Sequence, residues 1–537
     1  MIYRLASTFA ILTTFCLSAK CELMEAIWGA YRQIPISDVE NAKWRQQDYV
    51  KDGWDWSLPP DTPLSKNAFF SIFRTWSPRD ITKLKNLPKL KFKCNPMVEH
   101  WVRWRDIEKS EGVYDFEFLR QMIDAAAERG YSSSVRLLTA ARQFTPRYFE
   151  NLDIKKHDAS GGDFVESYDP ADPEFHKRYL KLVEAFAESE IAKMDAVQGI
   201  YIGYASPSFG DEGIGPENPD SHKHVKERLN AWAEALRGVE KKAYMGGWSD
   251  FGRGKGFGIR RGFVEMYLYH IPDQQIGQAL DAQGYLTSDE NNPLIKSGAI
   301  HGEENEEYES RWATAETNYR FGRDISSFQY RYFCSTLRLL QMRCNRVLWN
   351  NFTLNSEFYA WAALELGKSA SDAPDAWCFL RESYLKPYYS KKPVKNFERW
   401  LFQRDAEGFK TKAEIKIEHA AKMWMVDKPW DFAARSGKKI GFFAARNFIF
   451  GKSQSVVFKI TFWDEKPGRF LLCISENGKR REIAIECPGS KKLKTASIRA
   501  DADFGMSGKF DFTLEALGDS TPPIIFVRLI KAPRKEG

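Results

Sequence analysis

Short apolar runs alternate with amphipathic helical patterns from about residue 67 to residue 350, and this alternation limits the fold more than any other feature of the sequence. One helix follows Asp115 and ends at Gly130, and another opens at Asp172-Pro173 as an N-cap followed by proline. The candidate strands are 69–73, 97–102, 133–138, 197–203, 243–247, 280–283, 299–302 and 346–349. Because a closed parallel barrel is made of eight such units, we predict a (β/α)8 TIM barrel.

The pattern changes after about residue 410, where segments become short and rich in β-formers. Examples are 455–462, 469–473 and 523–529, with turn signals such as Glu476-Asn-Gly between them. We therefore predict an antiparallel β-sandwich domain over 410–535. The barrel domain is expected over 67–405, with helical residues between 355 and 405 completing it, and residues 20–66 form an irregular lead-in.

The first residues carry one cation, Arg4, followed by an apolar run of about a dozen residues and a small residue, Ala19. This pattern is typical of a signal peptide and is too short to span a bilayer. We predict cleavage after residue 19 and a secreted or periplasmic protein. We expect no integral membrane segment after signal removal, and buried free thiols at the cysteines, although Cys473 and Cys487 could lie on neighbouring strands.

Charge and composition argue against several classes of protein. The net charge of +7 is mild and shows no concentrated basic face, so we do not expect a nucleic-acid partner. The cysteines and eight histidines lack metal-ligand spacing, and we expect no metal and no cofactor. No Gly-x-Ser-x-Gly motif of a serine nucleophile occurs. The glycine-rich run at 252–258 matches no phosphate-binding fingerprint, and we interpret it as a flexible site loop.

Two predicted strand ends are unusually acidic. One holds Asp211 and Glu212 after the fourth strand, and the other holds Glu303 and Glu304 after the seventh. Residues 212 and 303 are 91 positions apart, and three βα units of a barrel span about 90 residues. Retaining cleavage of a glycosidic bond needs two carboxyl groups across the bond, one as acid and one as nucleophile. Such acids are also common in solvated loops, which is the alternative interpretation of both segments.

The segment Trp104-Arg-Asp-Ile-Glu-Lys-Ser-Glu-Gly-Val-Tyr-Asp-Phe116 resembles the region after the second strand of β-galactosidase-like clan-A glycoside hydrolases. The resemblance covers the layout of about 67–350 but only about a dozen residues closely. It implies that Glu212 is the acid/base and Glu303 the nucleophile, with Glu304 second. The chain departs from the clan because Asp211, not asparagine, precedes Glu212, and the usual partner of the sugar 2-hydroxyl is therefore missing.

Further residues are candidates for substrate binding because they lie at or near strand ends. They are Trp101, Arg136, Asp211, Trp248, Trp349 and Asn350. Trp349 is also the position where the resemblance implies an aromatic sugar platform. The alternative for each is barrel packing or an ion pair, and Glu108 and Glu111 fit a structural loop better than a site.

These features favour a retaining glycoside hydrolase that acts on a β-linked poly- or oligosaccharide. A galactan, including a sulfated one, is among the substrates we consider, and the 17 tryptophans would suit sugar stacking. The sandwich would then be an accessory domain. The alternatives are a non-catalytic carbohydrate-binding barrel, which the missing asparagine favours, and a polysaccharide lyase using Tyr204 or His301 as a base.

Overall fold

The computed structural model describes residues 52–158, 166–203, 222–263, 276–289, 291–304, 328–348, 356–382, 395–414, 433–506 and 509–532. The predicted signal peptide and most of the lead-in lie outside these residues. So do four of the predicted site residues, Asp211, Glu212, Trp349 and Asn350.

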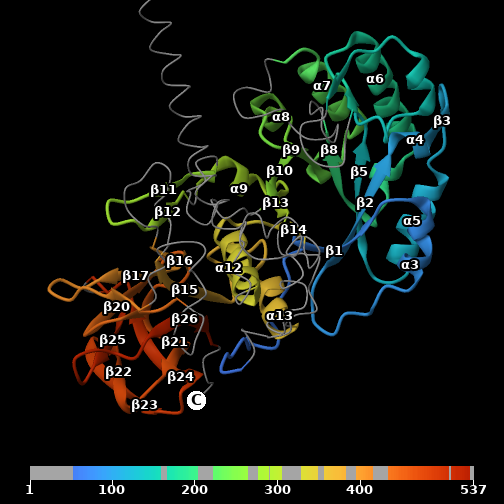
Figure 1. Cartoon of the computed structure of the whole chain (residues 1–537). Coiled ribbons are helices and arrows are strands. Elements are labelled where there is room, and N and C mark those ends of the chain that lie inside the picture. The colour runs from blue at the N-terminus through green and yellow to red at the C-terminus, as the bar shows by residue number, and fades with distance from the viewer. Residues whose placement is uncertain are drawn as a thin grey trace, which may run out of the picture.

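Eight parallel strands close into a barrel, as the sequence predicted. In chain order they are β1 (Phe69–Thr75), β2 (Pro96–Arg103), β5 (Ser132–Leu138), β8 (Val197–Ile202), β9 (Ala243–Gly246), β10 (Gly258–Phe263), β13 (His301–Glu304) and β14 (Arg346–Leu348). Each strand pairs with its neighbours in chain order, and β1 closes the ring on β14 through Phe69–Arg346 and Ser71–Leu348. The barrel occupies one half of the molecule in Figure 1, in blue to yellow.

Helices cover the outside of the barrel. They are α3 (Ile81–Lys85), α4 (Trp104–Ile107), α5 (Glu117–Ala127), α6 (Pro173–Glu188), α7 (Val225–Ala235), α8 (Asp250–Gly254), α9 (Pro293–Ser297), α12 (Phe328–Gln341) and α13 (Ser356–Glu365). The Asp172 carboxylate caps α6 by accepting from the amides of Glu174 and Phe175. The chain leaves α5 through Gly130, whose φ of +83° suits glycine. Apolar helix faces pack on outward strand residues such as Val98, Val135 and Ile200.

The sixth barrel strand is β10, and the prediction of a strand at 280–283 was wrong. Residues 278–280 instead form β11 (Gln278–Leu280), which pairs with β12 (Leu286–Ser288) in a separate antiparallel hairpin. The glycine-rich run interpreted as a flexible loop forms α8 and the start of β10. Here a Cβ at Gly258 would collide with the Ile300 carbonyl, and one at Gly252 with the Met245 sulfur. These two glycines therefore allow close packing.

The C-terminal part is a β-sandwich, as predicted. One sheet contains β16 (Lys395–Arg399), β15 (Asp375–Glu382), β26 (Ile524–Lys531), β19 (Arg435–Ser436) and β18 (Lys412–Ala413), joined by β21 (Gly451–Asp464) and β24 (Lys492–Phe504). The other contains β17 (Leu401–Asp405), β20 (Lys439–Ala444), β25 (Phe512–Ala516), β22 (Pro467–Glu476) and β23 (Lys479–Pro488). Alternate residues such as Val456, Phe458 and Ile460 fill the space between the sheets.

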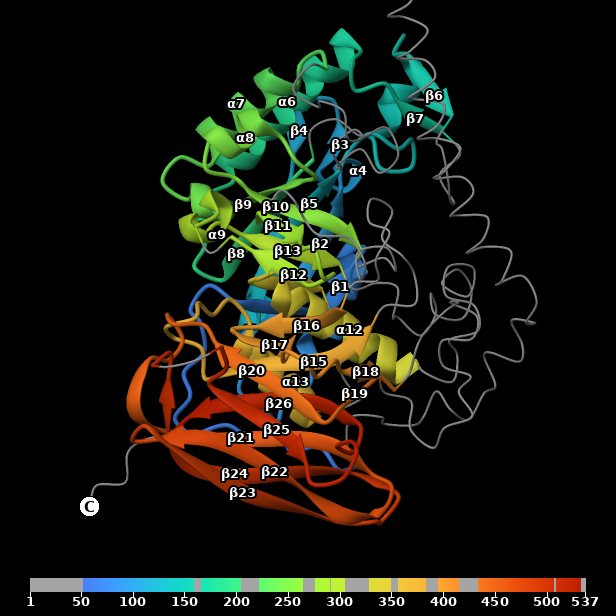
Figure 2. The same ribbon diagram turned by 90° about the vertical axis from the view of Figure 1, so that its left-hand side faces the viewer.

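The sandwich begins earlier in the chain than the expected boundary at 405–410. Residues 375–405, expected to be helical, contain β15, β16 and β17, and β15 pairs with β26 near the C-terminus. Among the described residues between 355 and 405, α13 is the one helix. Figure 2 shows α12 and α13 between the barrel and the sandwich.

An aromatic cluster joins the two domains. The stacked rings of Trp54 and Trp56, 5.0 Å apart, come from the lead-in. Trp56 packs on Trp361 of α13 at 4.9 Å and on Phe526 of β26 at 5.7 Å. Phe526 also packs on Trp377 of β15, so one face of this sandwich sheet is covered by the barrel's helices.

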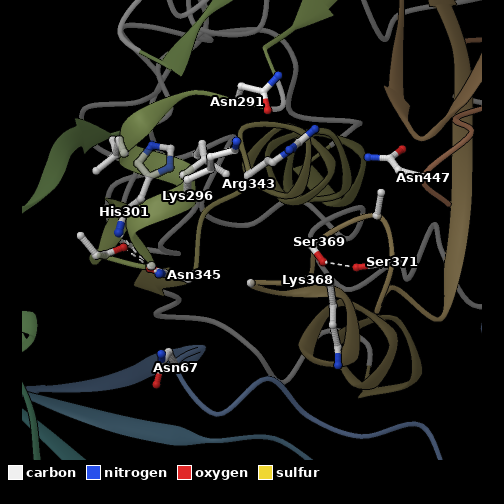
Figure 3. Close-up of a pocket in the computed structure, with 16 residues that line it drawn as sticks. Asn67, Asn291, Lys296, His301, Arg343, Asn345, Lys368, Ser369, Ser371 and Asn447 are labelled. Carbon is white, nitrogen blue, oxygen red and sulfur yellow. Dashed lines mark hydrogen bonds between the residues drawn. The ribbon is translucent and has the colours of Figure 1, made fainter.

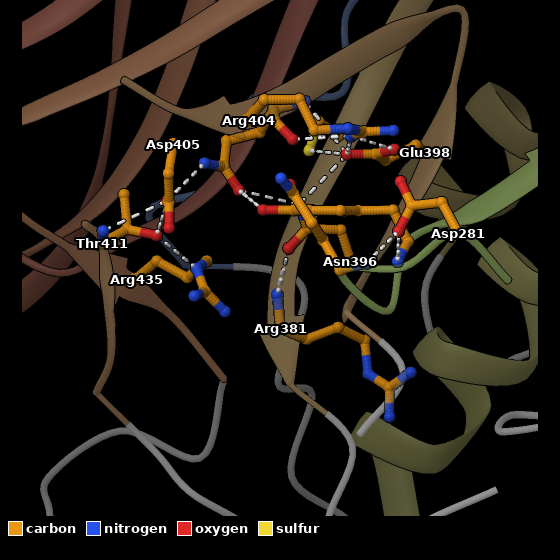
Figure 4. Close-up of polar contacts among 12 residues, drawn as sticks. Asp281, Arg381, Asn396, Glu398, Arg404, Asp405, Thr411 and Arg435 are labelled. Atoms are coloured by element: carbon orange, nitrogen blue, oxygen red, sulfur yellow. Dashed lines mark hydrogen bonds and ion pairs between the residues drawn. The ribbon is translucent and has the colours of Figure 1, made fainter. Parts of the chain in front are cut away.

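The β11–β12 hairpin makes a second junction. Its Tyr285 ring lies under the Arg404 guanidinium at 3.8 Å, and the Gly284 carbonyl accepts from the Lys395 amide. Arg404 is held in turn by both carboxylate oxygens of Glu398 at 2.9 Å, within the polar network of Figure 4. The connection between the sixth and seventh barrel strands is thereby fixed to the sandwich.

No helix in the described part of the chain is long and apolar enough to cross a membrane. Cys473 and Cys487 do lie on the paired strands β22 and β23, and both are free thiols, as are the other described cysteines Cys94, Cys344 and Cys378.

Candidate active site at the barrel mouth

The carboxyl ends of the barrel strands form the face where TIM-barrel sites lie. In chain order β8 is the fourth strand and β13 the seventh, so both acidic segments follow the strands to which they were assigned. Glu303 and Glu304 are the last two residues of β13 and pair with Val347 and Leu348 of β14. Glu212 and Asp211 follow β8 but lie outside the described residues.

Trp101 lies inside the mouth, between two guanidinium groups. Arg74 of β1 lies 4.0 Å from the centre of its ring, and Arg136 of β5 lies 3.9 Å from it. The indole N–H donates to the Glu99 carboxylate at 3.1 Å, and the side chain is only 4% exposed. Both faces of this ring are thus covered by cations, which makes Trp101 a support for the two arginines.

Two tyrosines continue this layer around the barrel. Arg136 also lies over Tyr201 at 4.6 Å, and Arg260 donates to the Tyr201 hydroxyl at 3.2 Å. Tyr244 is on the next strand, β9, and the guanidinium of Arg346 on β14 lies 4.7 Å from its ring. The predicted residues Trp101 and Arg136 are therefore brought together by the fold, whereas Arg74, Arg260 and Arg346 were not predicted.

Among these described side chains positive charge is in excess, and three guanidinium groups, those of Arg346, Arg260 and Arg74, act on the carboxylate of Glu99. Burial alone would raise the pKa of Glu99. The charges of Arg346, Arg260 and Arg74 outweigh burial and hold the pKa below its ordinary value. Such an interior favours the ionised form of a nearby carboxyl group and the binding of anions.

Trp76, which sequence reasoning missed, lies at the rim of the mouth directly after β1. It is 40% exposed, and its ring packs against Trp101 with centres 4.5 Å apart. Its amide donates to the Asp80 carboxylate at 2.9 Å, and Asp80 belongs to a capping box with Ser77 that turns the chain into α3. The signal available in the sequence was an aromatic residue at the end of the first predicted strand.

Trp248 follows β9 and is half-buried. Its indole N–H donates to Asp250 at 2.8 Å, and its ring packs on the core outside the barrel strands. Of the six predicted substrate-binding residues, the described part of the chain therefore contains three, and only Trp101 and Arg136 lie together.

The Trp104–Phe116 segment, which carried the resemblance, forms a structural turn, as expected for Glu108. The buried Glu108 carboxylate accepts from the Trp104 indole at 2.6 Å, the Gly112 amide at 2.7 Å and the Tyr148 hydroxyl at 2.8 Å. Gly112 has a φ of +74°, which a side chain would strain. Glu111 is exposed and pairs with Arg178.

A cavity of about 500 Å³ lies at the opposite end of the barrel (Figure 3). It is lined by Asn67, Ala299 and Asn345, which precede β1, β13 and β14, and by Asn447 of the sandwich. Because these positions lie at the amino ends of the strands, the cavity does not belong to the barrel mouth.

One group in the described chain has the side chains of a metal site: His176 of α6, with His224 and Glu227 at the start of α7. Arg228 donates to Nδ1 of His176 at 3.2 Å, so that nitrogen is unprotonated and Nε2 carries the proton shared with Glu227 at 2.6 Å. A metal at Nε2 would leave the ring without a proton. The group fits a polar clamp between α6 and α7 better than a metal site.

This clamp predicts a loss of stability in acid. Burial, together with Arg228 and His224, lowers the pKa of His176 to about 4, despite the opposing effect of Glu227. As the pH falls from about 6.5 to 4, His176 binds a proton in the unfolded chain but not in the native chain, and the native state is destabilised. We expect this group to cost about 1–3 kcal/mol of unfolding free energy over that window.

Urea unfolding of the wild type and His176→Gln at pH 7.0 and 4.5 measures this effect. The variant should lose less stability on acidification than the wild type by that amount. Equal losses in the two proteins would contradict the prediction.

No family model and no curated protein matches the sequence. Among solved structures, the catalytic domain of β-amylase from Paenibacillus polymyxa is 10% identical, covering 56% of this chain and 98% of that one, with a TM-score of 0.31. An α-amylase from Geobacillus thermoleovorans complexed with acarbose is 11% identical over 88% and 98%, with a TM-score of 0.34. A GH30 endoxylanase from Clostridium papyrosolvens C71 is 9% identical over 88% and 99%, with a TM-score of 0.25. Likenesses this weak carry no functional argument, so the barrel assignment rests on the strand pairing itself.

Proposed function

We propose that the protein is a retaining glycoside hydrolase that cleaves a β-linked poly- or oligosaccharide, with a galactan as the first substrate to test. Glu212 would be the acid/base and a glutamate at the end of β13 the nucleophile. The observation that carries the proposal is the order of the barrel strands. The acidic segments follow the fourth and seventh strands of a closed barrel, on the face where such sites are built.

The register of β13 supports Glu304 over Glu303 as the nucleophile. Glu303 pairs with Val347, which belongs to the core outside the barrel. Gly302 pairs with Arg346, whose guanidinium lies inside the barrel against Tyr244. Since positions alternate between the two faces of a strand, position 304 shares the interior face with position 302. Glu303 remains the alternative.

The charges of the mouth suit a division of labour between the two acids. A nucleophile must be ionised, and the guanidinium groups of Arg136 and Arg260 favour an ionised carboxylate in the interior. The acid/base must hold a proton in the resting enzyme, and this is the role proposed for Glu212. In the first step the acid would protonate the leaving oxygen while the nucleophile attacks the anomeric carbon. In the second step the same residue would act as a base and take a proton from water, and this water would release the sugar from the nucleophile.

The N-terminal signal pattern supports export, so we propose that the substrate is met outside the cytoplasm. The sandwich would serve as an accessory domain to the barrel.

The test is digestion of a panel of β-linked glycans, galactans included, with product size and anomeric configuration followed by NMR. Retention in the first-formed product is expected, and inversion would refute the two-step mechanism. Aspartate in place of asparagine at position 211 favours a second candidate, a barrel that binds oligosaccharide without cleaving it, and binding without product would establish that function. An unsaturated product absorbing in the ultraviolet would instead identify a lyase.

A further inference from the structure

Arg74 and Trp76 together form a cationic and aromatic surface at the rim of the barrel mouth. Trp76 is 40% exposed and Arg74 is half-buried, so both present part of their surface to solvent. The Arg74 guanidinium lies 5.8 Å from the Trp76 ring and 4.0 Å from the Trp101 ring. The exposed indole and the half-buried guanidinium therefore lie next to each other at the rim.

The two groups recognise different parts of a sugar. An indole face packs against the C–H face of a pyranose ring. A guanidinium presents paired N–H donors that match the oxygens of a sulfate or carboxylate, and the pair is strongest when it is bidentate. Neutral hydroxyl groups would use only part of this capacity. The pair therefore fits a pyranose that carries an anionic group better than a neutral one.

Neighbouring residues hold Arg74 in place before a ligand arrives. Its guanidinium rests on Trp101, whose indole N–H is fixed by Glu99 at 3.1 Å. Arg136 lies on the other face of the same ring at 3.9 Å and is buried. A second cation behind the ring adds to the positive potential at the rim, and a fixed side chain loses little conformational entropy on binding.

We propose that Arg74 and Trp76 form a subsite for an acidic sugar unit, and that the natural substrate is a glycan bearing sulfate or carboxylate groups. This inference rests on the proposed function for its position next to the scissile bond. Sulfate and carboxylate share the recognition chemistry, and separate substrates distinguish them.

The experiment compares kcat/KM of the full chain on three matched sets of oligosaccharides with the same backbone: neutral, sulfated and carboxylated. The wild type should prefer at least one anionic set over the neutral one by about tenfold, the value of one charged hydrogen-bonded contact. Arg74→Gln should remove most of that preference, and Arg74→Lys should restore part of it. Arg237→Gln removes the same charge from a side chain that is 75% exposed at the far end of α7, and should keep the preference.

A wild-type enzyme that cleaves neutral and anionic sets equally well would overturn the proposal, as would a preference that Arg74→Gln leaves intact. Thermal melts of each variant show whether it is folded.

Affinity electrophoresis separates this proposal from the proposed function, because it needs no turnover. Gels containing sulfated, carboxylated or neutral glycan should retard the wild type most in an anionic gel. Arg74→Gln should be retarded less there, and Trp76→Ala less in every gel. Retardation without hydrolysis would keep the subsite and reject the hydrolase. Hydrolysis with equal retardation in all gels would keep the hydrolase and reject the subsite.

Discussion

Glu212→Gln and Glu304→Gln are each expected to lower kcat by at least about 10³-fold on a good substrate while leaving the fold intact. Glutamine keeps the size of the side chain but can neither release a proton at Glu212 nor attack carbon at Glu304. Initial rates on the best glycan of the panel measure the effect. Glu303→Gln, tested beside them, decides between the two neighbours on β13 and should cost far less than Glu304→Gln.

Two controls give this comparison its meaning. Glu111→Gln changes an exposed glutamate that pairs with Arg178 of α6 and should retain wild-type rates. Glu304→Ala with added azide should yield a glycosyl azide of inverted configuration, because the small anion replaces the missing nucleophile. Unchanged rates in both Glu212→Gln and Glu304→Gln would end the proposed mechanism.

Asp375→Ala is expected to lower the free energy of unfolding by about 3–5 kcal/mol, because it removes the counter-ion of a buried positive charge. The Asp375 carboxylate is fully buried at the start of β15 and pairs with the Arg528 guanidinium of β26, which is 2% exposed. It also accepts from the Trp361 indole at 3.2 Å. Urea unfolding of the full chain measures the loss.

The surroundings of Asp375 offer little compensation. Burial is the largest cause that holds the pKa of Glu365 well above its ordinary value, and it remains when Asp375 is removed, so Glu365 is a poor substitute as an anion. The double variant Asp375→Leu/Arg528→Met should recover most of the loss, since it removes both charges. Asp372→Ala, at a nearby exposed position, is the control. A loss in Asp375→Ala no greater than in that control would show that the ion pair contributes little.

The periodicity of the sequence was sufficient to predict most of the barrel. Strands such as β2 and β5 place Val98, Val102, Val135 and Leu137 toward the helices, and Gly130 and Asp172 mark helix ends, so local signals and the fold agree there. The prediction of the sixth barrel strand was wrong for a physical reason. The interior positions of β10 are Gly258 and Arg260, and the strand therefore lacks the apolar run that predicts burial.

The start of the sandwich differs from the expected boundary because it depends on pairing between distant segments. β15 lies just after a barrel helix in the chain, but its partner β26 begins about 150 residues later, at Ile524. The candidate site was predictable to a similar degree. Trp101 and Arg136 follow from strand position, whereas their stacking with Arg74 depends on the register between three strands. The roles of Glu212, Glu303 and Glu304 stay predictions.

Strands β15 and β26 of the sandwich are buried on both faces. Phe526 and Trp377 on one side are sealed by Trp56 and Trp361, while Val527 and Leu529 on the other side meet the second sheet. Separating the two domains would expose this aromatic face to solvent, and we expect the isolated sandwich to self-associate. The sandwich is packed against the barrel and is not joined to it by a flexible linker alone. We therefore expect the two domains to unfold together, in one thermal transition.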